Sequence, residues 1–144
     1  MPALAAHAAV HAPAERAIVR VLNRTRRAHG LHPLRMARGL HRAARSHSFD
    51  MLVRNMLTHD AGNGTPFGAR VRRGAGYRAV GENVAWMPQG TGSGARSVVR
   101  LWMHSPPHRA QLLSPSYRFI GVGRLHGRLG RSPGVIVTAD FATR

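Results

Sequence analysis

Cysteine is absent from this sequence of 144 residues. Its absence excludes disulfide bonds, zinc–thiolate sites and a cysteine nucleophile. It does not assign a cellular compartment, because exported bacterial domains also fold without disulfides. The sequence also lacks any apolar run that approaches the roughly 20 residues a helix needs to cross a bilayer. We therefore expect no transmembrane segment.

Acidic residues are scarce, and lysine is missing altogether. Five acids stand against 22 arginines, which gives a formal net charge of +17. Bias toward GC-rich codons is the simpler explanation, and anion binding is the alternative, since guanidinium pairs with phosphates and carboxylates at two points. Under either explanation the surface should attract polyanions such as nucleic acid, anionic lipid or cell-wall polymers. With only 6% aromatic residues, nucleic acid is expected to bind only nonspecifically.

The length and the 43% of hydrophobic residues fit one domain with a core of its own. Residues 1–14 are rich in alanine but carry no basic stretch and no long apolar run. We expect them to form a flexible leader or the remnant of a trimmed signal peptide. Residues 15–144 should then form a single domain, which we expect to be a monomer.

The spacing of apolar residues predicts the secondary structure. Helices are expected at Glu15–His29, Met36–Asn55 and Ala95–His104, with shorter ones at 67–73 and 108–113. Strands are expected at Val80–Trp86, Phe119–Leu125 and Val135–Phe141. In the first helix, the arginines should lie on the outer face. Because strands and helices do not alternate, this order predicts an α+β fold with a small antiparallel sheet between helices.

Glu82 is the acid that stands out, because it lies between Gly81 and Asn83 at the start of an apolar strand. His59 and His108 lie in polar segments on either side of it in the sequence. Two neutral imidazoles and one carboxylate are a possible zinc set with a position left open for water. The same three residues could also do acid–base work, with Glu82 orienting a histidine, or form only a buried hydrogen-bond network. No short metal motif is present, so the spacing leaves all three interpretations open.

Two other kinds of catalytic site are not favoured by the sequence. Ser105 and His108 have no orienting acid nearby, and no G-x-S-x-G motif is present, so a serine hydrolase is not indicated. Glycoside hydrolysis would need Glu82 paired with another carboxylate, and the spacing favours none of the candidates Asp50, Asp60 and Asp140.

His47 falls on the apolar stripe of the second helix, where a histidine is usually a hydrogen-bonded core residue. Large aromatic side chains are interpreted as core and not as ligand-stacking residues: Trp86, Trp102, Tyr117 and Phe141. These residues therefore predict packing, and the candidate chemistry stays with His59, Glu82 and His108.

Taken together, these segments resemble the CAP superfamily, also called the SCP or cysteine-rich secretory, antigen 5 and pathogenesis-related 1 domain, and in particular its cysteine-free bacterial branch. The resemblance covers about Ile18 to Phe141 in the family's order. The matching motifs are Leu22-Asn23-x-x-Arg26, Gly30-Leu31-x-Pro33-Leu34, Ala43-Ala44-x-x-His47-Ser48-x-Asp50-Met51, Leu57-Thr58-His59, Gly76-Tyr77, Gly81-Glu82-Asn83-Val84-Ala85, Trp102-Met103-x-Ser105-Pro106-x-His108-Arg109, Leu112-Leu113, Tyr117, Gly121-Val122-Gly123 and Asp140-Phe141.

The resemblance implies a three-layer α-β-α sandwich and a secreted or cell-envelope protein. It also implies a central cleft with two histidines and two acids, which in some relatives binds a divalent metal. By motif, His59 and His108 match the histidines and Glu82 the first acid, whereas Ser105 stands where the second acid usually is. We expect a cleft of His59, Glu82, Ser105 and His108, with zinc as the most suitable metal for His59, Glu82 and His108.

The family's known functions are diverse and include lipid or sterol binding, defence roles and contested protease activity, so the resemblance assigns no enzyme. We expect a binding protein whose ligand is a lipid or an anionic component of the cell envelope. The alternatives are a metal-assisted hydrolase that uses the same cleft and a nonspecific polyanion binder that uses the arginine-rich surface.

Overall fold

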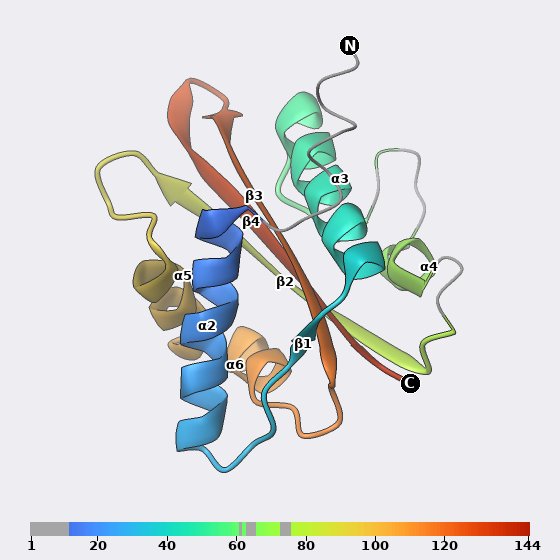
Figure 1. Cartoon of the computed structure of the whole chain (residues 1–144). Helices are drawn as coiled ribbons and strands as arrows, with labels where there is room; N and C mark the ends of the chain where they lie inside the picture. Colours follow the sequence, from blue (N-terminus) through green and yellow to red (C-terminus); the bar gives the residue numbers. More distant parts are fainter. Residues whose placement is uncertain (1–11, 61, 63–65, 73–75) are drawn as a thin grey trace.

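The structure is a computed structural model that describes residues 12–60, 62, 66–72 and 76–144. One four-stranded sheet lies between two layers of helices (Figure 1). This arrangement confirms the α+β fold and the expected α-β-α sandwich. The expected leader over residues 1–14 falls mostly outside the described residues and stays a prediction. Within the described residues, no helix is both long and apolar enough to span a membrane.

The sheet has the strand order β1-β3-β4-β2. Three long strands pair antiparallel: β2 (Ala79–Pro88), β3 (Phe119–Leu129) and β4 (Ser132–Thr143). The short β1 (Arg35–Met36) pairs parallel with β3, which makes the sheet mixed at one edge. Here the expected helix start at Met36 is wrong, because the edge carbonyl of Ile120 accepts the backbone N–H of Ala37 and keeps this segment extended.

On one face of the sheet lie α2 (Pro13–Ala28), α5 (Ala95–Met103) and α6 (Pro106–Leu112) (Figure 1). Their apolar side chains form the main core with the sheet, including the fully buried Ile18, Leu22, Trp102, Ile120 and Phe141. Tyr117 is also buried in this core, and Trp86 packs against a smaller core cluster on the opposite face, as expected. Because proline is tolerated in the first turn of a helix, the two prolines that end α5 begin α6.

Arg26 departs from the expectation that the arginines of the first helix face outward. Its side chain is fully buried. The guanidinium donates from Nε to His32 O at 2.9 Å and from Nη1 to Leu112 O at 2.8 Å and Ser114 O at 2.9 Å. Backbone carbonyls therefore bind Nε and Nη1 of this buried cation and tie α2 to the end of α6.

The other face of the sheet is covered by α3 (Arg38–Arg54) and α4 (Phe67–Arg72) (Figure 1). Helix α3 packs very close to β3, because Gly121 and Gly123 have no side chain to hold it away. A Cβ atom at Gly121 would lie 2.0 Å from the backbone carbon of Leu40. Ser48 completes the contact by donating to Gly123 O at 2.8 Å. This close packing sets the height of α3, and of the loop that follows it, above the sheet.

Glu15 joins the two layers of helices beside the middle of β3. Its carboxylate is fully buried and accepts the Ala12 N–H at 2.7 Å, which caps α2. It also contacts His41 Nε2 at 3.1 Å and Arg45 Nη1 at 2.8 Å on α3, and accepts the backbone N–H of Arg124 on β3 at 2.8 Å. One carboxylate thus links three elements, although the sequence indicated only a residue at the start of a helix.

Candidate functional site

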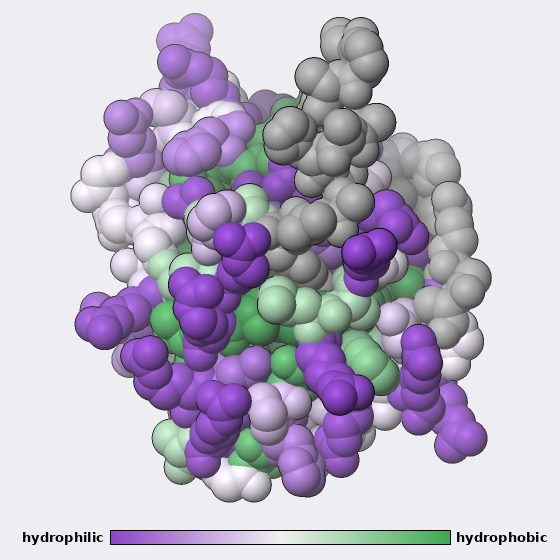
Figure 2. Space-filling model, viewed as in Figure 1, coloured by the Kyte–Doolittle hydropathy of each residue, from purple (hydrophilic) through white to green (hydrophobic). Residues whose placement is uncertain are grey.

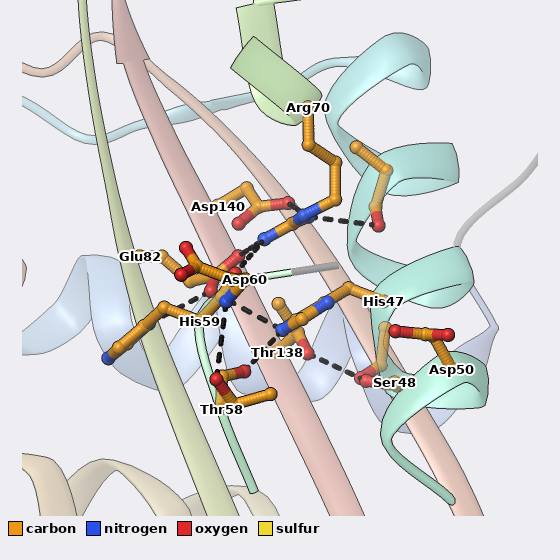
Figure 3. A network of polar contacts seen from close by, with 12 residues as sticks. His47, Ser48, Asp50, Thr58, His59, Asp60, Arg70, Glu82, Thr138 and Asp140 are labelled. Carbon is orange, nitrogen blue, oxygen red and sulfur yellow. Dashed lines mark hydrogen bonds and ion pairs between the residues drawn. The ribbon is translucent and has the colours of Figure 1, made fainter. Parts of the chain in front are cut away.

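Glu82 lies on β2, the outer strand of the sheet, on the face that α3 covers, and its residue is only 5% exposed. Oε1 lies 2.9 Å from His59 Nδ1 and 3.6 Å from His47 Nε2 (Figure 3). Oε2 forms a short ion pair with Arg70. Both oxygens of the buried carboxylate are therefore engaged by basic side chains.

Arg70 reaches this site from α4, and it was not among the residues predicted from the sequence. Besides Glu82, its guanidinium contacts Asp140 Oδ2 at 3.5 Å and the backbone oxygen of His59 at 3.3 Å (Figure 3). Arg70 thus holds the loop that carries His59 in place, and its positive charge stabilises the ionised form of Glu82. No signal in the sequence distinguishes Arg70 from the other arginines of this chain.

Asp140 is the carboxyl group that pairs with Glu82, and it was one of the three candidates left open. The two residues lie directly opposite each other on β2 and β4. Burial raises the pKa of Asp140 well above its ordinary value, and the neighbouring Glu82 raises it further. Burial opposes ionisation of Glu82 too, but hydrogen bonds from Asp140 and His59 and the charge of Arg70 lower its pKa to about 2. Glu82 is therefore the charged member of the pair and Asp140 the neutral one.

This pairing does not suit glycoside hydrolysis. Asp140 is fully buried and Glu82 is only 5% exposed, so neither carboxyl group is open to a sugar on both sides of its glycosidic bond. The other candidates are placed elsewhere: Asp50 pairs with Arg54 at 3.7 Å and accepts the Gly62 N–H at 2.9 Å, and Asp60 is exposed. The signal that could have identified Asp140 is its position as a single acid within an apolar strand.

His47 is a buried histidine that supports the loop of the site. Its Nε2 donates to the backbone oxygen of Thr58 at 2.6 Å, which positions the residue next to His59. Burial lowers the pKa of His47, so the neutral ring is favoured. The interpretation of His47 as a hydrogen-bonded core residue is thus confirmed, although it also lies beside Glu82.

His59 follows α3 in a loop, and its side chain is 48% exposed. Because Glu82 is ionised and can only accept, the proton on His59 must be at Nδ1, which leaves Nε2 facing away from the carboxylate. The hydrogen bond with Glu82 raises the pKa of His59. His59 is therefore an accessible imidazole whose orientation and tautomer are set by a buried acid.

His108 lies in the first turn of α6 and is held in a similar way by a different partner. Its Nδ1 lies 3.0 Å from Ser105 Oγ, and Asn83 donates to its backbone oxygen at 3.0 Å. Burial lowers the pKa of His108, and the nearby charge of His59 lowers it further. Ser105 thus orients the ring of His108, as Glu82 orients that of His59, and each ring makes this contact through Nδ1 and keeps Nε2 for another partner.

The fit of this site to a metal ion depends on which atoms remain available. Within the described residues, no group of three or more histidine and acidic side chains is arranged to hold a metal. The carboxylate of Glu82 is engaged by His59 and Arg70, so the available donors are the two Nε2 atoms. Neutral imidazole nitrogen suits zinc, and a carboxylate behind a ligating histidine is a common arrangement in metal proteins. The ligand set of His59, Glu82 and His108 stays a prediction.

A model of the cysteine-rich secretory protein family, CAP, matches residues 19–141 of the chain. The chain is 36% identical over 110 residues to the uncharacterized protein YkwD of Bacillus subtilis, an alignment that covers 76% of this chain and 41% of that protein. The chain thus spans about two-fifths of the length of this relative.

Solved structures show the same fold. An extracellular protein of Bacillus anthracis that contains an SCP domain superposes with a TM-score of 0.74 at 27% identity, over 90% of this chain and 40% of that one. An outer surface protein of Borrelia burgdorferi superposes with a TM-score of 0.71 at 18% identity, over 90% and 91% of the two chains. The second likeness concerns the fold alone.

Proposed function

The chain belongs to the CAP family of cysteine-rich secretory proteins, and from that premise we propose that it is a secreted or cell-envelope protein that binds a ligand in the cleft of His59, Glu82, Ser105 and His108. The ligand would be a lipid or an anionic component of the cell envelope. The observation that carries the proposal is the pair of imidazoles, each fixed through Nδ1 and each with Nε2 left for a partner.

Three features support this proposal. The similar Bacillus anthracis protein is described as extracellular. The net charge of +17 favours anionic ligands. Figure 2 shows hydrophilic side chains standing out across the face on which α2 lies, and that helix exposes Arg20, Arg24 and Arg27. A protonated His59 can donate a hydrogen bond to a phosphate or carboxylate.

We also propose a divalent metal as a second occupant of the same cleft. His59 and His108 would hold it through Nε2, and Glu82 would keep the His59 ring oriented. Bound zinc would supply a Lewis acid to which an anionic group could bind. A ligating imidazole must be neutral, and the pKa of His59 is raised above its ordinary value of 6.5. We therefore expect the metal affinity to increase as the pH rises through the pKa of His59.

Calorimetric titration with zinc, above neutral pH, tests this part of the proposal. We expect heat of binding from the wild type and none from His59→Ala or His108→Ala. Glu82→Gln should bind about 10–100 times more weakly, because the ring loses its orienting partner. His126→Ala is the matched control, since His126 is exposed on β3 away from the cleft. Equal heats in the wild type and both cleft variants would rule out the metal site.

A hydrolase that uses the same cleft is the second candidate, and one observation favours it. The pKa of His59 is raised by its hydrogen bond with Glu82 and that of His108 is lowered by burial, so His59 holds a proton more readily than His108 does. Such a difference is what a general acid and a general base require. This candidate requires metal-dependent turnover that disappears in Glu82→Gln, and a substrate screen without such turnover counts against it.

A further inference from the structure

An apolar patch lies on the outer side of α3 and its continuation. It consists of Phe49, Val53, Met56 and Leu57, which are 54%, 67%, 48% and 50% exposed. Phe49 and Val53 lie four residues apart and therefore share one face of α3. Met56 and Leu57 follow the end of the helix, and the sulfur of Met56 lies beside Arg54. Exposed apolar side chains that gather in one region and are rimmed by polar residues mark interaction surfaces. We call these four residues the α3 patch.

Basic side chains continue the α3 patch along the same helix. Arg38 and Arg42 are exposed two to three turns before Phe49, on the same side of the helix by the 3.6-residue period. At the other end, Arg54 lies next to the patch, with Nη2 3.7 Å from the sulfur of Met56. The acid on this helix, Asp50, is paired with Arg54 at 3.7 Å. The outer side of α3 therefore combines an apolar half and a basic half over about 16 Å from Arg42 to Val53.

We propose that this side of α3 docks on the surface of an anionic lipid bilayer. A helix that lies in a membrane interface inserts apolar side chains among the acyl chains and places arginines at the headgroups. Anionic headgroups attract such arginines, and the net charge of +17 adds a long-range attraction for the whole chain. The complementary charge is what favours a lipid surface over a second copy of this chain, because two copies would bring two strongly basic surfaces together.

The position of the α3 patch gives this docking a consequence for the cleft. Leu57 lies two residues before His59 in the loop that follows α3. Insertion of the patch would therefore bring the exposed ring of His59 close to the headgroup layer. The docking does not depend on the proposed cleft function, since none of the four patch residues belongs to the cleft.

A single cysteine label tests the docking directly, because the chain has no cysteine of its own. Val53→Cys carries an environment-sensitive fluorophore into the α3 patch, and Leu101→Cys carries it to α5, where Leu101 is 46% exposed on the opposite face of the sheet. With vesicles of phosphatidylglycerol and phosphatidylcholine we expect a blue shift for the label at 53 and none at 101. Vesicles of phosphatidylcholine alone should shift neither. A label at 53 that stays in water, or an equal shift at both positions, overturns the proposal.

Sedimentation with the same anionic vesicles measures the contribution of the patch. Phe49→Ser combined with Val53→Ser should weaken binding on the order of tenfold or more, whereas Leu101→Ser should bind as the wild type does. Equal binding by all variants would assign the attraction to the arginines alone and contradict the proposal. A different set of results would assign the patch to a second copy of the chain and overturn the proposal. In that case the wild type does not bind vesicles and is dimeric in solution, whereas the double variant is monomeric.

Discussion

Replacing Glu15 with alanine should lower the free energy of unfolding by about 3–5 kcal/mol. The carboxylate is fully buried and contacts two backbone N–H groups, His41 and Arg45. Removing it leaves those groups without their acceptor in the interior, and a buried donor without a partner costs more than the bond itself contributes. Chemical denaturation at neutral pH measures the loss.

The same residue predicts a pH dependence with a definite sign. Burial opposes ionisation of Glu15, but the hydrogen bonds from His41, Arg124 and Ala12 and the charge of Arg45 lower its pKa from 4.5 to about 2. Because the pKa of Glu15 is lower in the folded protein, the charged carboxylate stabilises the fold at pH values above its pKa in the unfolded chain. This stability is lost as the pH falls from about 4.5 toward 2. The shift corresponds to about 3 kcal/mol.

Two comparisons separate this effect from general acid denaturation. The difference in unfolding free energy between the wild type and Glu15→Gln should shrink as the pH falls below 4.5, the ordinary pKa of the side chain. Asp50→Asn is the matched control, because the contacts of Asp50 with Arg54 and with the Gly62 N–H are open to solvent and an amide oxygen can still accept from Gly62. It should change the stability by less than about 0.5 kcal/mol. A Glu15→Ala protein as stable as the Asp50→Asn protein contradicts the role assigned to Glu15.

Gly121→Ala should destabilise the protein by about 3 kcal/mol or more. The added Cβ would lie 2.0 Å from the backbone carbon of Leu40 and 2.2 Å from the backbone nitrogen of His41. Backbone atoms of a packed helix cannot move aside as a flexible side chain can, so α3 would have to lift from the sheet. The loop that carries His59 follows α3, so we also expect the contact between His59 and Glu82 to weaken.

Gly39→Ala is the control for this substitution, because a Cβ there meets no atom within 4 Å. Gly39 lies in the first turn of the same helix, and alanine there should stabilise the protein by up to about 0.5 kcal/mol. Thermal unfolding of the two variants should therefore shift in opposite directions. If Gly121→Ala unfolds at the wild-type temperature, the close packing of α3 against β3 is not as described.

The sequence predicted the long elements and the layer arrangement because these depend on apolar spacing and on turn residues, which are local signals. It missed β1 because a segment of two residues is too short to show a periodic pattern. This segment is a strand only because its backbone pairs with the edge of β3. It also placed Arg26 outside, since a helical pattern cannot show that carbonyls far along the chain, at Leu112 and Ser114, are available to bind a buried guanidinium.

The candidate site was predicted only in part, for a similar reason. His59, Glu82 and His108 are identified by motifs, and the structure brings Glu82 directly to His59 and Ser105 to His108. Arg70 and Asp140 complete the site through contacts that depend on the register of β2 with β4 and on the position of α4. An arginine among 22 and an acid within an apolar strand acquire their roles only when the chain is folded.

The central claim is that the buried Glu82 carboxylate orients the accessible ring of His59 and favours its protonated form. A titration of the histidine rings by nuclear magnetic resonance, in the wild type and in Glu82→Gln, tests it most directly. We expect the pKa of His59 to lie above 6.5 in the wild type, with the proton on Nδ1 when the ring is neutral, and to fall in the variant, which loses the charge of the carboxylate. A His59 pKa that is the same in both proteins would contradict the account.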